Sequence, residues 1–349
     1  MTSTTTLRPA HLDLRWFAVA LGLLAGAFLI GVVIGPAHLS VGGVVRSVLD
    51  RLPILRLDSG LTGRQEAILW EIRIPRVVLG GLVGATLAGS GAAYQGVFRN
   101  PLADPYLLGV AAGAGLGATL AIGFGWGGGW GPFAPLPLAA FVGGMAGVAL
   151  TYLIGSSAGR STLSLILAGV AVASFLTAIQ TFVQQRRSET LREVYGWILG
   201  RLSTVGWNEV LLLIPYALVA AIVTIAGRGL LDILAVGDEE AASLGVAPDR
   251  VRAVLIVIAT LGTAAAVAVS GLIGFVGIIV PHTVRLVAGS SYRTIVPLSL
   301  VLGAAFLIGA DVLARTVVSP AELPIGVVTA FFGAPFFALV LRTARGTMS

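Results

Sequence analysis

Ten apolar runs, most of them close in length to a bilayer-spanning helix, recur along the chain. A helix needs about 20 apolar residues to cross the hydrocarbon core, and a backbone in lipid must satisfy its polar groups internally. The sequence therefore predicts an all-α polytopic membrane protein, one domain over residues 1–349 with about ten transmembrane helices. The predicted spans are 16–35, 76–97, 106–124, 135–155, 162–185, 208–227, 250–271, 276–289, 295–317 and 325–342.

Composition agrees with this fold class and excludes several functions. Charged residues make up 11% of the chain, against roughly 25% in soluble domains. Cysteine is absent, which excludes thiolate metal sites and disulfides. All 22 basic residues are arginine, so the chain has neither a P-loop lysine nor a Schiff base. Because the arginines are scattered between spans, nucleic acid is not an expected partner. We expect no catalytic residue, cofactor or metal site in this chain.

The polar segments between the spans predict an orientation. Residues 1–15 form a short head with Arg8 and Arg15, which the positive-inside rule places in the cytoplasm. An even number of spans puts both termini on that side. Segments 36–75 and 186–207 are then extracytoplasmic, and 229–249 is a cytoplasmic loop. The positive-inside rule supports this orientation only weakly, because the predicted outer segments hold at least as many arginines as the inner ones. Most of the outer arginines lie beside acidic residues.

Two similarly spaced pairs indicate an inverted internal repeat. Ser90-Gly91 precedes Pro101 by the same spacing as Ser270-Gly271 precedes Pro281. One of the apolar runs that these pairs close descends through the membrane and the other ascends, an arrangement common in transporters. Chance alone also produces such matches in a chain this rich in glycine and serine.

An acid-rich segment from Ala235 to Arg252 separates two long apolar runs. It contains Asp238, Glu239, Glu240 and Asp249, and a charged segment between spans lies in water. The segment is long enough for one or two short helices that another protein could hold. On the residues alone, a solvated loop without a partner is an equal alternative.

Five stretches resemble the FecCD-type permeases, the membrane subunits of ABC importers for ferric siderophores, haem and cobalamin. The resemblance runs from about residue 16 to 345, and its most specific motifs are RNPLADP, GFVGIIVPH and ELPIGVVTA followed by GAP. The stretches are IRIPRVVLGGLVGATLAGSGAAYQGVFRNPLADPYLLGV (72–110), STLSLILAGVA (161–171), GDEEAASLGV (237–246), SGLIGFVGIIVPHTVRL (270–286) and AELPIGVVTAFFGAPFFALVL (321–341).

The resemblance implies a type II ABC importer permease fold in the bacterial cytoplasmic (inner) membrane. It implies a dimer with a second copy or a paralogue, and two cytoplasmic ATPase subunits that bind the ATP and Mg. It also implies an extracytoplasmic binding protein that delivers the substrate. The chain itself would be a transport subunit without enzymatic activity.

The resemblance places Asp232 to Val246 in the loop that seats in a groove of the ATPase. Two glycines can break the backbone at either end of a short helix that starts with acids, and acids favour a helix N-terminus. Glu240-Ala241-Ala242 is followed by two residues before Gly245, a spacing typical of the FecCD version of this loop. The residues expected to couple to the ATPase are Gly237, Asp238, Glu239, Glu240, Ala241, Leu244 and Gly245.

Three arginines are expected to dock the binding protein. Arg73 and Arg76 lie at the outer mouth of the second predicted span, and Arg315 lies at the outer end of the ninth. In the resembled family, arginines at these positions meet carboxylates of the binding protein, and an arginine fork suits bidentate carboxylate recognition. The alternative is interfacial snorkelling.

A polar strip on the fifth predicted span is the candidate translocation pathway. Its members recur every three or four residues and so share one helical face, and a strip facing lipid would be costly. They are Ser174, Thr177, Gln180, Thr181 and Gln184. The resemblance places this face at the dimer axis and puts Thr162 and Leu163 at a cytoplasmic gate, although the family has a small hydroxyl residue where this chain has Leu163. Inter-helix hydrogen bonding is the alternative role of the strip.

The sequence favours a ferric siderophore, an iron chelate, as the substrate, with haem and cobalamin as alternatives. Arg186 and Arg187 at the outer end of the strip would favour an anionic chelate. A proton-coupled secondary carrier is the alternative of a different class, and Asp311 would be its acid. Arg315 lies one turn after Asp311, which makes a structural pair the expected arrangement. His282 is expected to be structural.

Overall fold

The computed structural model describes residues 14–35, 37, 39–51, 58–126, 134–157, 159, 162–202 and 206–345. In these ranges all regular structure is helical. Seven helices are long and apolar enough to cross a membrane: Leu14–Val33 (α1), Gly63–Val97 (α3 and α4 with the turn between them), Pro135–Ser157 (α6), Leu163–Arg186 (in α7, which begins at Thr162), Asn208–Val236 (α9), Pro248–Ser270 (α11) and Tyr292–Thr316 (α13). Three shorter apolar helices are Val110–Gly123 (α5), Val276–Ala288 (α12) and Ile325–Val340, within α14 (Ile325–Arg345).

The ten predicted spans are thus matched by the seven long and three short helices, and the fold class is confirmed. The two spans predicted at 106–124 and 276–289 are the short helices α5 and α12. The remaining helices are peripheral or form turns. They are α2 (Val41–Asp50), η2 (Pro105–Leu108), η3 (Ser188–Thr190), α8 (Leu191–Ile198) and α10 (Asp238–Ser243). The Gly63–Val97 span itself consists of α3 (Gly63–Ala67), η1 (Ile68–Arg73) and α4 (Ile74–Val97).

Two span boundaries differ from the prediction by nine residues or more, because polar residues continue the helices. The second span begins at Gly63 rather than 76, since Thr62 and Gln65 form a capping box there. A π-helical turn, Ile68–Arg73, ends two residues before Pro75, whose missing N–H removes one helical hydrogen bond. Similarly, α9 runs to Val236, so the first part of the predicted cytoplasmic loop is helical.

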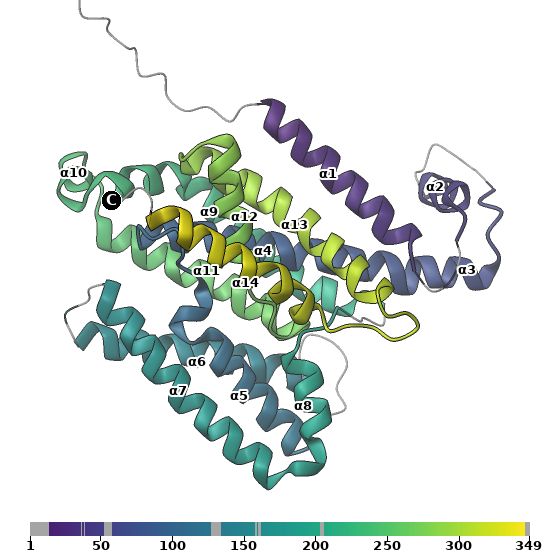
Figure 1. The fold of residues 1–349 in the computed structure, drawn as a ribbon, viewed down its shortest axis with the longest axis horizontal. Helices are drawn as coiled ribbons and strands as arrows, with labels where there is room; N and C mark the ends of the chain where they lie inside the picture. The colour runs from purple at the N-terminus through teal and green to yellow at the C-terminus, as the bar shows by residue number, and fades with distance from the viewer. Residues whose placement is uncertain are drawn as a thin grey trace, which may run out of the picture.

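Helix α4 forms the centre of the molecule and packs against α9, α11, α12 and α13 (Figure 1). Glycine makes the closest crossings possible. A Cβ at Gly84 would lie 2.2 Å from the carbonyl oxygen of Gly303, and one at Gly91 would lie 2.1 Å from that of Gly277. Small residues let helix backbones approach in a bilayer, where packing rather than the hydrophobic effect drives association.

Helices α5, α6 and α7 form a second group that lies along one side of the central helices (Figure 1). Here too, glycines are the crossing points, since a Cβ at Gly113 would lie 2.1 Å from the carbonyl oxygen of Gly143. Only 28% of the most apolar window of α7 is buried within the chain, and the figure for α1 is 17%. Both helices therefore present broad apolar faces to their surroundings.

The two pairs of the predicted repeat differ in local structure. Ser90 and Gly91 lie within α4, whereas Ser270 ends α11 and Gly271 follows it. Pro101 lies in a turn, but Pro281 lies inside α12. The two pairs therefore lie in different local structure, and the inverted repeat stays a prediction.

Candidate functional site

The predicted coupling segment contains a short exposed helix between two backbone breaks. α9 ends at Val236, Gly237 is extended, and α10 (Asp238–Ser243) follows at once. Gly245 after it has φ +78°, in the left-handed region that favours glycine. A Cβ at Gly237 would lie 1.7 Å from Oε2 of Glu240, so this carboxylate folds back over the glycine. The two glycines therefore set the helix apart, as the sequence predicted.

The faces of α10 differ. Ala241 is fully buried and anchors the helix, whereas Leu244 just beyond it is 67% exposed. Glu239 and Glu240 are exposed, and among the described residues their carboxylates make no hydrogen bond or ion pair. The helix thus offers acids and one apolar side chain to the surroundings.

Asp238 behaves differently from its two acidic neighbours, because two arginines hold it. Arg252 of α11 donates to both carboxylate oxygens, with Nη1–Oδ2 at 2.9 Å and Nη2–Oδ1 at 2.5 Å. Arg99, from the turn after α4, pairs with the same Oδ1 and also donates from Nε to the carbonyl oxygen of Leu234. The Arg252 hydrogen bonds, helped by the charge of Arg99, hold the pKa of Asp238 below its usual value. We call Arg99, Asp238 and Arg252 the inner clamp.

Asp232, which was expected in the loop, lies inside α9 and holds the start of another span. Its carboxylate accepts from the hydroxyl of Ser291 at 2.7 Å and from the backbone N–H of Tyr292 at 2.6 Å. These contacts satisfy the N-terminus of α13. The residue is therefore an internal tie between α9 and α13.

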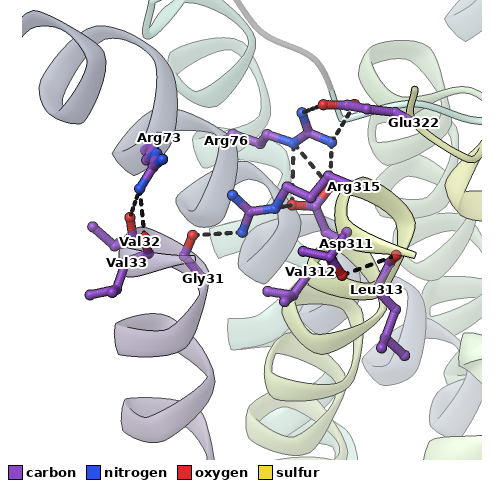
Figure 2. A network of polar contacts seen from close by, with 11 residues as sticks. Gly31, Val32, Val33, Arg73, Arg76, Asp311, Val312, Leu313, Arg315 and Glu322 are labelled. Carbon is purple, nitrogen blue, oxygen red and sulfur yellow. Dashed lines mark hydrogen bonds and ion pairs between the residues drawn. The ribbon is translucent and has the colours of Figure 1, made fainter. Parts of the chain in front are cut away.

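At the other end of the molecule, the predicted docking arginines gather in one network (Figure 2). Arg76 forms two bidentate pairs, one with Asp311 through Nε at 3.0 Å and Nη2 at 2.8 Å, and one with Glu322 through Nη1 at 3.0 Å and Nη2 at 2.9 Å. Arg315 approaches Asp311 to 3.2 Å, so the expected pair one turn apart is present. We call Arg73, Arg76, Asp311, Arg315 and Glu322 the outer network.

Arg73 and Arg315 are turned towards the end of α1. Arg73 donates to the carbonyl oxygens of Val32 at 2.9 Å and Val33 at 2.7 Å, and also to that of Ala37. Arg315 donates to that of Gly31 at 2.6 Å. Cations are favoured at a helix C-terminus, where carbonyl groups lack intrahelical partners. The two arginines therefore fasten α1 to α4 and α13.

This burial bears on the docking prediction. Arg73 is 4% exposed and Arg315 is 3% exposed, and each donates to backbone carbonyl oxygens within the chain. Arg76 is held on one side by the buried Asp311 and on the other by Glu322, whose side chain is 42% exposed. Docking stays a prediction for all three arginines. Arg76 is the one whose exposed partner, Glu322, could be replaced by a carboxylate of another protein.

The polar strip on α7 is divided between two faces. Ser174, Thr177 and Thr181 are exposed, and two of their hydroxyls donate to carbonyls one turn earlier in the helix. Gln180 and Gln184 are each 9% exposed, and a Cβ at Gly115 of α5 would lie 3.0 Å from Oε1 of Gln180. The two glutamines therefore pack within the chain, so the five side chains do not share one exposed face.

The predicted gate lies at the start of this helix. Thr162 is the first residue of α7, but its side chain lies outside the described residues. Leu163 is 66% exposed. Whether these positions form a gate stays a prediction.

Other lone groups have structural surroundings. His282 packs edge-on against Phe336, with ring centroids 5.7 Å apart. Among the described residues no group of three or more His, Asp or Glu side chains could hold a metal ion. The functional candidates missed by the sequence reasoning are Arg99, Arg252 and Glu322. Arg99 and Glu322 lie within the motifs RNPLADP and ELPIGVVTA, which was the available signal for both.

The comparisons with known proteins agree with this architecture. Residues 23–343 match the FecCD transport family. The cobalamin import system permease protein BtuC of Halobacterium salinarum is 36% identical, with 94% of this chain and 95% of the relative covered. The Fe(3+)-citrate import system permease protein YfmD of Bacillus subtilis is also 36% identical, with 88% and 90% covered.

A solved structure has the same fold. It is an inward-facing conformation of a metal-chelate type ABC transporter, with a TM-score of 0.82 at 29% identity, and the match covers 95% of this chain and 100% of that one. The family match spans most of the chain and the two relatives extend over nearly their full length. The chain therefore belongs to the FecCD transport family of ABC transporter permeases.

Proposed function

We propose that this chain is the permease subunit of an ATP-driven importer that moves an iron chelate from an extracytoplasmic binding protein into the cytoplasm. Two separate ATPase subunits bind ATP and Mg and hydrolyse the nucleotide. A second permease copy or a paralogue completes the pathway. Both termini lie in the cytoplasm, which places α10 on the side of the ATPase.

The observation that carries this proposal is the exposed acidic helix α10. It projects at the junction of α9 and α11 (Figure 1), and its backbone is set by glycine at both ends. Glu239, Glu240 and Leu244 are exposed, while Ala241 anchors the helix. A helix that is fixed on one face and free on the other suits a groove in a partner protein.

The exposed face of α7 suits the pathway between two permease subunits. Ser174, Thr177 and Thr181 lie on it beside large apolar side chains. Hydroxyl groups that are satisfied within their own helix can border water without binding the substrate tightly. Because Gln180 and Gln184 are buried within the chain, the three exposed hydroxyl residues, rather than the glutamines, line this pathway in the proposal.

Two kinds of support favour an iron chelate as the substrate. The YfmD relative is named for Fe(3+)-citrate, and the matching structure for metal chelates. Arg186 and Arg187 are exposed at the outer end of α7, where positive charge attracts an anionic chelate. Haem and cobalamin are the alternatives, since the BtuC relative is named for cobalamin import.

A proton-coupled carrier is less well supported. Asp311 was its candidate acid, but two arginines contact this carboxylate. The carboxylate is thus the shared partner of Arg76 and Arg315, a structural role that accounts for it without proton transport. In addition, the carrier mechanism gives no role to the free acids of α10.

Charge reversal on α10 tests the proposal. We expect E239R/E240R to abolish co-purification of the ATPase and ATP-dependent uptake, with the permease still inserted and monodisperse. The double variant E189R/E193R changes net charge equally on exposed outer residues and serves as the matched control. Uptake into cells is followed with a ⁵⁵Fe-loaded siderophore panel, haem and cobalamin in parallel. Normal uptake and ATPase binding by E239R/E240R would contradict the proposal.

A further inference from the structure

The inner clamp joins three segments that are far apart in sequence. Asp238 begins α10, Arg252 lies near the start of α11, and Arg99 lies in the turn after α4. Both carboxylate oxygens of Asp238 are used, and both arginines share Oδ1. A movement of α10 would therefore pull on α4 and α11 through a single carboxylate.

Arg99 is held in a conformation that aims it at α10. Its φ is +49°, one of two positive φ values among the described non-glycine residues. The surrounding turn is fixed by its own hydrogen bonds, from Asn100 N to the oxygen of Gln95 at 3.1 Å and from Leu102 N to Oδ1 of Asn100 at 2.9 Å. A residue other than glycine rarely adopts a positive φ unless the surrounding structure imposes it. The turn thus acts as a rigid arm.

The same arm reaches the helix of the predicted pathway. The turn leads into η2, and a Cβ at Gly169 of α7 would lie 2.0 Å from the carbonyl oxygen of Leu107. At the far end of η2, a Cβ at Gly147 of α6 would lie 2.5 Å from the oxygen of Gly109. Backbones in such close contact move together, so residues 99–109 connect Asp238 to α6 and α7.

A cavity beside the clamp leaves space for this movement. It has a volume of about 270 Å³ and is lined by the three clamp residues together with Tyr152, Ser156 and Leu165. The last three belong to the cytoplasmic ends of α6 and α7, next to the predicted gate at Thr162 and Leu163. Residues 99–109 are therefore packed tightly against α7 near Leu107, but have open space beside Arg99.

We propose that Asp238 is a positioning residue that transmits the displacement of α10 through Arg99 to α7, and that it is not itself a contact residue for the ATPase. This inference rests on the proposed function. It assigns different tasks to adjacent acids, since Glu239 and Glu240 are exposed and make no ion pair with a described residue, whereas Asp238 is paired with Arg99 and Arg252. It also gives RNPLADP a role, as the rigid arm between the coupling helix and the pathway.

The test measures coupling rather than binding or stability. D238N, R99Q and the double variant are reconstituted in proteoliposomes with the ATPase that co-purifies with the wild-type permease, and the substrate moved per ATP hydrolysed is measured. We expect each single variant to lose at least about tenfold in this ratio and the double variant to lose no more, because residues of one pathway are non-additive. ATPase co-purification and basal hydrolysis should stay within twofold of wild type.

E239Q is the matched control, since it removes the neighbouring charge without touching the clamp. We expect it to weaken ATPase binding while keeping the wild-type ratio in the complexes that form. A wild-type ratio in D238N, additive losses in the double variant, or loss of ATPase binding in D238N would overturn the inference alone. A wild-type permease that binds no ATPase and takes up substrate without ATP would overturn the proposed function as well.

Discussion

The inner clamp and the outer network use the same chemistry at opposite ends of the molecule. Both join arginines to carboxylates across segments distant in sequence. In the inner clamp, the side chains of Arg99 and Asp238 are 36% and 50% exposed. In the outer network, Asp311 and Arg315 are both 3% exposed at the side chain. Water therefore screens the first and is excluded from much of the second.

This difference separates stability from transmission. Exposed ion pairs contribute only about 0–1 kcal/mol, so the clamp adds little to the stability of the fold. Removing one partner of a buried pair costs about 3–5 kcal/mol, because the other charge is left buried without compensation. The outer network therefore behaves as a fixed anchor for α1, α4 and α13, whereas the proposed role of the inner clamp is transmission rather than stability.

The largest expected effect is at Asp311. D311N leaves Arg76 and Arg315 without their shared buried carboxylate, so we expect a loss of about 3–5 kcal/mol in unfolding free energy. Unfolding in detergent, followed by circular dichroism, measures this loss. D238N is the matched control in the inner clamp and should cost under about 1 kcal/mol. Equal losses in the two variants would show that the two clusters do not differ as described.

The next effect concerns the fastening of α1. R73M keeps the apolar stem but removes the donors to Val32, Val33 and Ala37, which leaves carbonyls unsatisfied at a cost of about 1–3 kcal/mol. We expect faster hydrogen exchange in the last turn of α1, with little change in α9. R46M, which alters an exposed arginine of α2, is the control. Unchanged exchange in α1 would mean that Arg73 does not hold this helix.

A smaller effect sharpens the docking prediction. Arg76 has both edges of its guanidinium occupied, so a carboxylate of a binding protein must displace Glu322, the exposed one. E322Q should therefore tighten binding-protein association by about three- to tenfold, roughly 1 kcal/mol, measured by titration of the binding protein onto detergent-solubilised permease. E71Q changes another exposed outer acid and should have no effect. Weaker association of E322Q would indicate that Glu322 itself takes part in docking.

The smallest expected effect is that of pH on the inner clamp. The pKa of Asp238 is lowered from 3.8 in the folded chain, so its pairing is present above that value and is lost only as pH falls through the lower folded pKa. Substrate moved per ATP should therefore be independent of the ionisation of Asp238 near neutral pH. Loss of coupling in the wild type between pH 6 and pH 5, absent in D238N, would contradict this assignment.

Local patterns in the sequence predicted much of this structure. Apolar run length gave the spans, two glycines marked α10, and the four-residue spacing of Asp311 and Arg315 gave their pairing. Helix boundaries were less accessible, because a capping box at Thr62 and a π-turn before Pro75 extend α4 through polar residues.

The long-range contacts could not be predicted from one sequence. Arg99 and Asp238 are 139 residues apart, and Arg76 and Glu322 are 246 apart. No spacing rule relates such positions, since their proximity depends on how α4 crosses α9 and α13. For the same reason, the division of the α7 strip became visible only when Gln180 was found against α5.

The most direct test of the account follows α7 while the ATPase cycles. The chain has no cysteine, so T177C provides a single thiol on the exposed face of α7, with L176C as its buried neighbour. We predict that reaction of T177C with a water-soluble maleimide changes at least about threefold when the ATPase is trapped with nucleotide, and that D238N abolishes the change while L176C stays unreactive. Equal reactivity of T177C in both nucleotide states, in the presence of Asp238, would contradict the claim that α10 drives this pathway.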